Sequence, residues 1–180
     1  MDVDATICRA VDRAEKEFKS VVRDPSPRVD HYIRSSEGLG WDWTDEYKMD
    51  KQFEWCGAFA AFCHTAVLPQ IRKKHFPSTY RLYTWAKGTP RMIPLEEIQP
   101  GDICITSTAN TKKKWGQHIT LCVEVLDEEY IRTIEGNAWG HLPSGEYAQG
   151  VVTRKRCLVK GREASWVSHA YKLLEEDFQP

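Results

Sequence analysis

The sequence predicts an α+β fold in which helices come first and an antiparallel β-sheet follows. Apolar residues recur at helical spacing between residues 3 and 21, and they are nearly continuous from Glu54 to Val67. After Pro94 the pattern changes to short alternating segments separated by turn residues. A chain of 180 residues has the usual size of one domain. We therefore expect a single domain in which N-terminal helices, one of them buried, pack on one antiparallel sheet.

Four helices are predicted in the first half of the chain. The first is amphipathic and ends at the Asp24-Pro25-Ser26-Pro27 segment. A shorter helix covers Val29 to Ser35, and a last one covers Tyr80 to Lys87. Between them, the segment from Glu54 to Val67 is apolar on all sides, which indicates a buried central helix that ends at Pro69.

The second half of the chain is predicted to form strands, with the last segment open to either a strand or a helix. The expected strands and this last segment are Ile103–Thr106, His118–Leu126, Tyr130–Glu135, Val151–Val159 and Ser165–Leu174. We divide the domain into an N-terminal helix (1–25), a core (28–160) and a C-terminal segment (161–180).

Charge and hydropathy exclude several classes of partner. The chain carries 25 Lys and Arg against 26 Asp and Glu, so it lacks the basic surface expected of a nucleic-acid or anionic-membrane binder. No apolar stretch has the length of a membrane span, so membrane insertion is not expected. The first ten residues, MDVDATICRA, contain two acids and lead into no apolar signal region. We expect synthesis in the cytoplasm without a signal peptide.

Six cysteines are present, and their spacing shows no disulfide framework. Cys56 lies at the start of the buried helix, where free N–H groups and the helix dipole favour a thiolate. The alternative is a small core residue. Cys63, Cys104 and Cys122 are interpreted as core residues. Neither Cys-x2-Cys nor His-x3-His spacing occurs, so we expect no metal site, and no cofactor is expected.

A nucleophilic cysteine needs a base, and His118 is the best-placed histidine. It opens an alternating strand, whereas His64 lies about 12 Å along the helix from Cys56. If Asp127-Glu128 is a two-residue hairpin loop, paired residue numbers sum to 255. His118 then lies opposite Asn137 and diagonal to Glu135. Either residue can orient the imidazole, and the choice between them stays open.

Other residues near these segments are candidates for binding. The Gln52 side chain and the Cys56 backbone N–H are candidate oxyanion donors. Trp55, Trp115 and Trp139 flank the candidate catalytic segments, where they either line a substrate groove or pack in the core. The Lys112-Lys113-Lys114 segment is either a solvated loop or an attractor of substrate carboxylates.

Four motifs, in order, resemble the CHAP and NlpC/P60-like cysteine peptidases and amidases that cut bacterial peptidoglycan. They are Trp55-Cys56-Gly57-Ala58-Phe59, Pro100-Gly101-Asp102-Ile103, Gly116-Gln117-His118-Ile119 and Thr133-Ile134-Glu135-Gly136-Asn137. The resemblance covers roughly residues 32–159. It implies a papain-like fold with Cys56 as nucleophile, His118 as base, and Glu135 or Asn137 as the orienting residue. Gln117, where a glycine is common, the additional N-terminal helix and the lysine loop depart from the family pattern.

The expected function is hydrolysis of an amide bond in peptidoglycan, as an amidase or an endopeptidase. Without a signal peptide, the chain would reach the cell wall or periplasm by lysis, as a phage lysin (endolysin), or by a non-Sec route, as an antibacterial toxin (effector). A toxin would have a cognate immunity protein as a partner. Two alternatives stay open: a papain-like protease, deamidase or acyltransferase that acts on proteins, and a non-catalytic binding module of the same fold.

Overall fold

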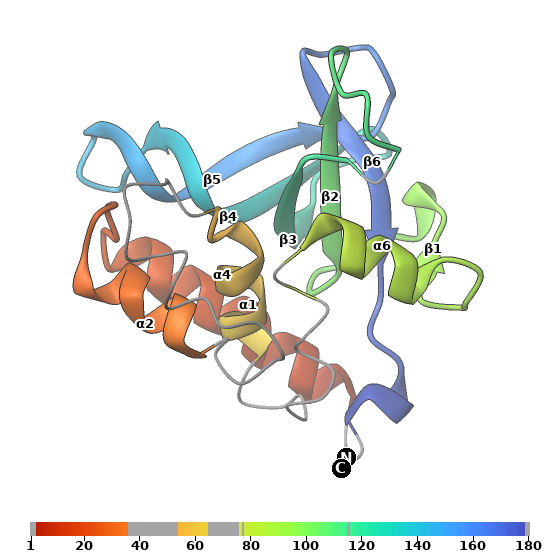
Figure 1. The fold of residues 1–180 in the computed structure, drawn as a ribbon, viewed down its shortest axis with the longest axis horizontal. Coiled ribbons are helices and arrows are strands. Elements are labelled where there is room, and N and C mark those ends of the chain that lie inside the picture. Colours follow the sequence, from red (N-terminus) through yellow and green to blue (C-terminus); the bar gives the residue numbers. More distant parts are fainter. Residues whose placement is uncertain (1–2, 36–53, 65–75, 77, 115, 179–180) are drawn as a thin grey trace.

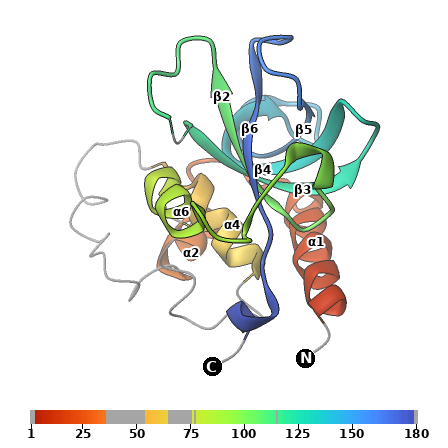
Figure 2. The ribbon, with the colours of Figure 1, turned by 90° about the vertical axis from the view of Figure 1, so that its right-hand side faces the viewer.

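A computed structural model describes residues 3–35, 54–64, 76, 78–114 and 116–178. Within these ranges there are four helices: α1 (Val3–Lys19), α2 (Pro27–Ser35), α4 (Cys56–His64) and α6 (Thr79–Ala86). All four overlap the helices predicted from the apolar periodicity. Figures 1 and 2 show α1, α2 and α4 together on one side of the strands. Within the described ranges, no helix combines the length and the apolar character needed to cross a membrane.

Six strands and two short 3-10 helices make up most of the remaining described chain. In order they are β1 (Met92–Ile93), η1 (Leu95–Glu97), β2 (Ile103–Thr108), β3 (His118–Val125), β4 (Tyr130–His141), β5 (Tyr147–Cys157), β6 (Ser165–Tyr171) and η2 (Glu175–Phe178). The segment after Ser165, left open between strand and helix, is therefore a strand. The strand order is β1-β6-β2-β3-β4-β5, and β5 also pairs with β6.

The β5–β6 pairing closes five strands into a barrel, with β1 added outside on β6 (Figure 1). The predicted fold class, a papain-like arrangement of helices on an antiparallel sheet, is therefore wrong. The closing contact is parallel and joins Cys157 to Trp166. A helix-on-sheet arrangement would bury mainly the face of the sheet that meets the helices. In fact both faces are buried, because Cys104, Cys122 and Ile131 join a second cluster that the barrel encloses.

The helices pack on the outer face of the barrel, mainly over β3 and β4. Side chains from α1, α2 and α4 form one cluster with Leu121, Val123 and Ile134. The opposite side of α4 packs with α6, β2 and Ile119. All nine residues of α4 are buried, which confirms the prediction of a buried central helix. Burial on all sides explains why this helix has no polar face.

The pairing of β3 with β4 has the predicted register near the candidate site, but a longer loop and a bulge produce it. The hairpin loop has three residues, Asp127 to Glu129, because the Leu126 N–H donates to the Tyr130 carbonyl at 3.0 Å. A bulge between Cys122 and Glu124 then shifts the pairing by one residue. Beyond the bulge, Leu121 pairs with Ile134 and Cys122 with Thr133, so the paired numbers sum to 255 as expected. The two irregularities cancel.

Candidate active site

Cys56 is the first residue of α4, and only 6% of its surface is exposed. The Trp55 carbonyl accepts the first helical hydrogen bond, from the Phe59 N–H at 2.9 Å. The Cys56 N–H therefore belongs to the first turn, where backbone N–H groups have no acceptor within the helix. A helix N-terminus favours negative charge, so this position suits both a thiolate and a developing oxyanion.

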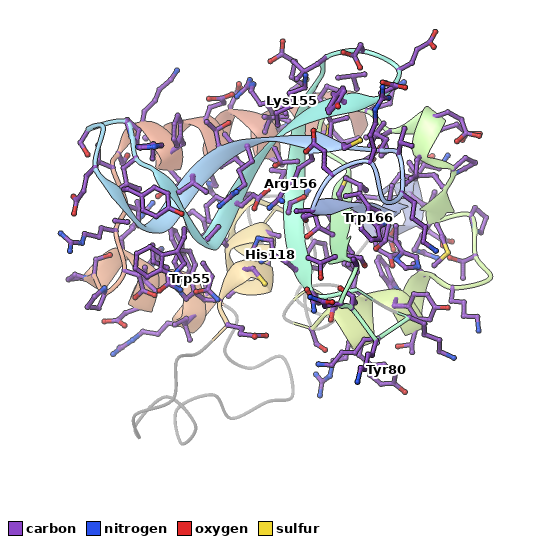
Figure 3. The ribbon with its side chains drawn as sticks, turned by 90° about the horizontal axis from the view of Figure 1, so that it is seen from above. Trp55, Tyr80, His118, Lys155, Arg156 and Trp166 are labelled. Atoms are coloured by element: carbon purple, nitrogen blue, oxygen red, sulfur yellow. The ribbon has the colours of Figure 1, made fainter. Side chains whose placement is uncertain are left out.

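His118 is the first residue of β3 and joins Cys56 to the barrel. Its Nε2 lies 3.1 Å from Oε2 of Glu135. Its side chain also interacts electrostatically with that of Cys56, and the two residues line the same cleft. Figure 3 shows His118 beside the start of α4. The imidazole thus lies near a thiol and hydrogen-bonds a carboxylate, as a Cys-His-acid constellation would require.

The surroundings of His118 favour the imidazolium form. Burial by itself lowers the pKa of His118, but the charge interactions and hydrogen bonds with Cys56 and Glu135 raise it to about 10. The side chain is 21% exposed, so the ring is reachable from solvent. The imidazolium is therefore the favoured form of His118 at neutral pH.

Glu135 is fully buried, and both of its carboxylate oxygens are hydrogen-bonded. Oε1 accepts from Thr133 Oγ1 and from Arg156 Nε, each at 2.6 Å. Oε2 accepts from Arg156 Nη2 at 2.5 Å in addition to its contact with His118. Burial raises the pKa of Glu135, yet the contacts with His118 and Arg156 outweigh it and hold the pKa well below its usual range. Glu135 is thus held as an anion that stabilises the imidazolium form of His118.

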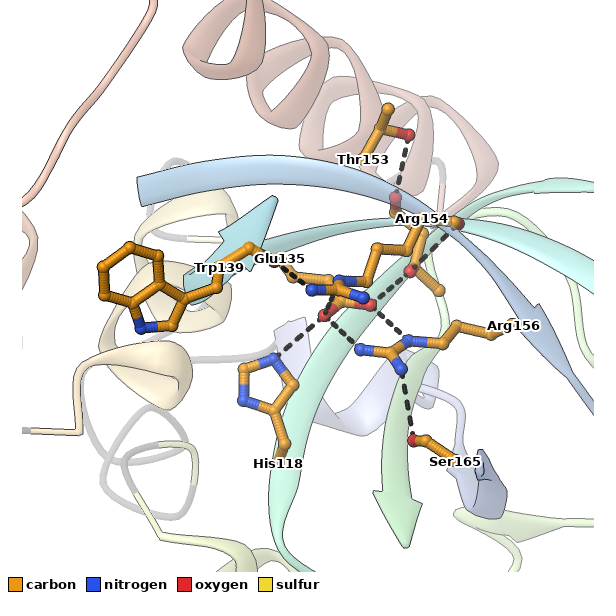
Figure 4. A network of polar contacts seen from close by, with 8 residues as sticks. His118, Glu135, Trp139, Thr153, Arg154, Arg156 and Ser165 are labelled. Carbon is orange, nitrogen blue, oxygen red and sulfur yellow. Dashed lines mark hydrogen bonds and ion pairs between the residues drawn. The ribbon is translucent and has the colours of Figure 1, made fainter. Parts of the chain in front are cut away.

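Arg156 is a site residue that the sequence reasoning missed. Its guanidinium binds Glu135 with two donors, and Nη1 donates to Ser165 Oγ at 3.2 Å (Figure 4). Arg154, two residues earlier on β5, adds a charge 3.9 Å from Oε2 of Glu135. The signal in the sequence is the run Arg154-Lys155-Arg156, in which the first and third side chains share one face of the strand. Using that signal requires the β4–β5 register, which pairs Thr133 with Arg154 and Ile131 with Arg156.

Asn137, one of the two predicted partners of His118, hydrogen-bonds Gln149 instead. Its backbone is left-handed, with φ 57°, in the irregularity of β4–β5 pairing between Glu135 and Ala138. Its Oδ1 accepts from Gln149 Nε2 at 2.6 Å. Of the two residues left open as the partner of His118, Glu135 makes the contact. Asn137 instead lines the hollow in front of the imidazole.

Gly136 explains how close β4 comes to the helix that carries Cys56. A Cβ at this position would lie 2.5 Å from Phe59 Cβ and 2.5 Å from Trp55 Cζ3. No larger residue fits without moving α4 away from β4, since core packing leaves no slack. The glycine of the Glu-Gly-Asn segment therefore sets the distance between the thiol and the carboxylate.

An open cleft of about 560 Å³ lies in front of Cys56 and His118. Its other walls come from the segment before α4, from the start of α6, from the loop between β2 and β3, and from β4. These lining residues are Glu54, Thr79, Asn110, Lys112, Lys113, Gly116, Gln117 and Asn137. Lys112 and Lys113, expected from the sequence to be a solvated loop or an attractor of carboxylates, thus line the same cleft as Cys56.

The remaining predicted site residues divide into three groups. Trp55 is 1% exposed and its Nε1 donates to Asp24 Oδ2 at 2.9 Å, so it packs in the core and does not line a groove. Trp139 is 55% exposed. Gln52 and Trp115 lie outside the described residues.

Other cysteines and His64 have structural surroundings. Cys63, Cys104 and Cys122 are buried, as predicted, and burial raises the pKa of each thiol. His64 is also buried, with Nδ1 2.8 Å from the Ala60 carbonyl. Within the described ranges, no group of three His, Cys, Asp or Glu side chains is arranged to hold a metal ion.

Comparison with known proteins returned no match: no family model, no curated protein and no solved structure is similar to this chain. The likeness to CHAP and NlpC/P60-like enzymes therefore depends on the four sequence motifs. The catalytic interpretation depends on the geometry around Cys56.

Proposed function

We propose that the protein is a cysteine hydrolase that cleaves an amide bond through an acyl-enzyme on Cys56. The observation that carries this proposal is the position of His118, whose imidazole interacts with Cys56 and Glu135 at once and borders an open cleft. A structural histidine has no need of a buried carboxylate on one side and a thiol at a helix N-terminus on the other. The combination is what activation of a nucleophilic cysteine requires.

The geometry supports a two-step reaction. The Cys56 sulfur attacks the amide carbonyl, and the carbonyl oxygen, now negative, is stabilised by the Cys56 backbone N–H. The His118 imidazolium gives its proton to the leaving amine, which breaks the C–N bond and leaves a thioester. Neutral His118 then takes a proton from a water molecule, whose oxygen attacks the thioester carbonyl. The C–S bond breaks, which releases the carboxylic acid and restores the Cys56 thiolate beside the His118 imidazolium. Glu135 stays ionised throughout and stabilises the imidazolium.

We propose peptidoglycan as the substrate, with the protein acting at the wall as a lysin or as an exported toxin. Support for this comes from the four motifs shared with wall-cutting enzymes, which lie in the family's order along this chain. Lys112 and Lys113 beside the nucleophile suit the carboxylates of a peptide stem. As a toxin, the protein would be neutralised by an immunity protein that fills the cleft.

The chemistry can be tested by alkylation with iodoacetamide. We expect Cys56 to react faster than exposed Cys8, because Cys56 lies beside His118 at a helix N-terminus. His118→Gln should abolish this advantage while leaving Cys8 unchanged. Equal, slow reaction of the six cysteines in the wild type would contradict the catalytic assignment.

The substrate can be tested by incubating purified sacculi with the protein and analysing the muropeptides by mass spectrometry. The wild type and Cys8→Ala should release new fragments, whereas Cys56→Ala should release none. The mass of the fragments distinguishes an amidase from an endopeptidase. A reactive Cys56 that leaves sacculi unchanged would reject peptidoglycan and favour an enzyme that acts on proteins.

A further inference from the structure

A second hollow adjoins the catalytic cleft, on the other side of the loop between β2 and β3. It has a volume of about 330 Å³ and is lined by side chains of that loop, of β6 and of the segment after β5. Lys113 lines both this hollow and the cleft. Figure 3 shows Trp166, which lines the second hollow, and Trp55, with His118 between them. The two hollows are therefore neighbours with one shared lysine.

The lysine, aspartate, glutamate and arginine side chains that line the second hollow are all of one kind, lysine, so its charge is positive. Three lysines line it, Lys113, Lys114 and Lys160, and no carboxylate does. In the part of the chain that the structure describes, none of these lysines takes part in an ion pair. The whole chain has a net charge of −1, so the concentration of ammonium groups is local and does not reflect a basic protein.

Fixed hydroxyl groups form another part of this hollow. Ser107 Oγ donates to Ser168 Oγ at 2.9 Å, and Ser168 Oγ in turn lies 3.2 Å from the Ile105 carbonyl. Thr108 Oγ1 is 3.1 Å from Thr111 Oγ1. Trp166, 7% exposed, lines the same hollow. The protons of Ser107 and Ser168 are thus already donated within the protein, so the three ammonium groups are the donors that suit an oxyanion attached to an organic chain.

We propose that this basic pocket binds a carboxylate or phosphate group of the substrate while the scissile amide lies at Cys56. The substrate would be an acidic chain that crosses residues 109–114 and meets Lys112 and Lys113 in the cleft, then Lys114 and Lys160 beyond it. This inference rests on the proposed function, since it assigns the substrate class to the same site. It adds a requirement for at least two negative charges, spaced across the loop.

Binding to the Cys56→Ala variant tests this proposal without turnover. The probes are hexaglutamate, an acidic chain, and inorganic phosphate, a free oxyanion, each titrated by calorimetry at low salt. Lys160→Met should weaken hexaglutamate binding roughly threefold to fivefold, since an exposed charge contributes modestly. Lys155→Met is the matched control. It removes the same charge from β5, where the ammonium lies 3.7 Å from the Tyr130 ring, apart from Trp166 (Figure 3).

The pattern across variants decides the outcome. A chain that crosses the loop predicts that Lys112→Met and Lys160→Met both weaken hexaglutamate, while only Lys160→Met weakens phosphate. Equal losses from Lys155→Met and Lys160→Met would overturn the proposal, because net charge would then be responsible. Hexaglutamate binding unaffected by Lys112→Met would also overturn it, by leaving only a site for free anions. Failure of the proposed function is separate, because it would appear as an unreactive Cys56 with this binding pattern intact.

Discussion

Two of the buried carboxylates in this molecule, Asp177 and Glu135, bind arginine in similar ways but differ in the other groups that surround them. Asp177, in η2, is fully buried and accepts from Arg91 Nε at 3.0 Å and Nη2 at 2.9 Å. It also accepts from the Leu174 backbone N–H at 2.9 Å, which ties the C-terminal segment to the body of the domain. Glu135 is equally buried and accepts from Arg156 at comparable distances.

The difference between the two centres lies in the third group. Glu135 shares Oε2 with His118, which borders a cleft and a thiol. The Asp177 contacts hold a chain end in place. A buried arginine–carboxylate pair is therefore no sign of function by itself. Such a pair indicates a functional site only when a titratable group with access to solvent also contacts the carboxylate.

When the two carboxylates are substituted in turn, the largest expected effect is on the rate of hydrolysis. Glu135→Gln should lower the rate of muropeptide release by about 10²- to 10⁴-fold, because the imidazolium loses its counter-charge. Asp177→Asn, the matched change in the structural centre, should leave the rate per folded molecule unchanged. Similar losses in both variants would show that the two centres act only through stability.

Next in size is the effect of removing each arginine on stability. Arg156→Met and Arg91→Met should each lower the free energy of unfolding by about 3–5 kcal/mol, because each leaves a buried carboxylate without its partner. Urea unfolding measures this loss. Only Arg156→Met should also slow alkylation of Cys56, since only Arg156 acts on the carboxylate that supports His118. A normal alkylation rate in folded Arg156→Met would remove Arg156 from the site.

A smaller effect is expected in the pH profile of the wild type. Above the pKa of His118, the rate of hydrolysis should fall about tenfold per pH unit. The pKa of His118 is raised to about 10, so the imidazolium persists below that pH and is lost above it. Hydrolysis should therefore fall as pH rises through about 10, and the stability that this ion pair contributes should fade over the same rise, from about 6.5 upward. Glu135→Gln should move the limit to lower pH, and Asp177→Asn should not. An alkaline limit that is the same in all three proteins would contradict the role of Glu135.

Local pattern was enough to predict the elements but not how the sheet closes. The buried helix α4 could be predicted because its sequence has no polar face, and β3 because Ile119, Leu121 and Val123 alternate with more polar residues. Barrel closure depends on the single pair Cys157–Trp166, which joins strands separated by a loop of irregular structure. No periodicity within either strand indicates that contact. The apolar residues on the second face of the strands, such as Cys122 and Ile131, were the available clue.

The site was predicted to the extent that it depends on chain order and parity. Cys56 at a helix start, His118 at a strand start and Glu135 on the adjoining strand all followed from short segments. The choice of Glu135 over Asn137 depends on the left-handed backbone of Asn137, which one sequence does not reveal. Arg156 could not be found because its partner lies on another strand, and that register is fixed by the fold as a whole.

The paired irregularities of the β3–β4 hairpin have a consequence for how this chain can change in length. A three-residue loop with a bulge and a two-residue loop without one lead to the same partners for Leu121 and Cys122. Deletion of one residue from the hairpin tip can thus be absorbed by the bulge at Val123, leaving Glu135 on the face that meets His118. A one-residue deletion at the tip is thus compensated before it reaches the end of the strands where Glu135 meets His118, so the loop can shorten while the geometry of the candidate site is retained.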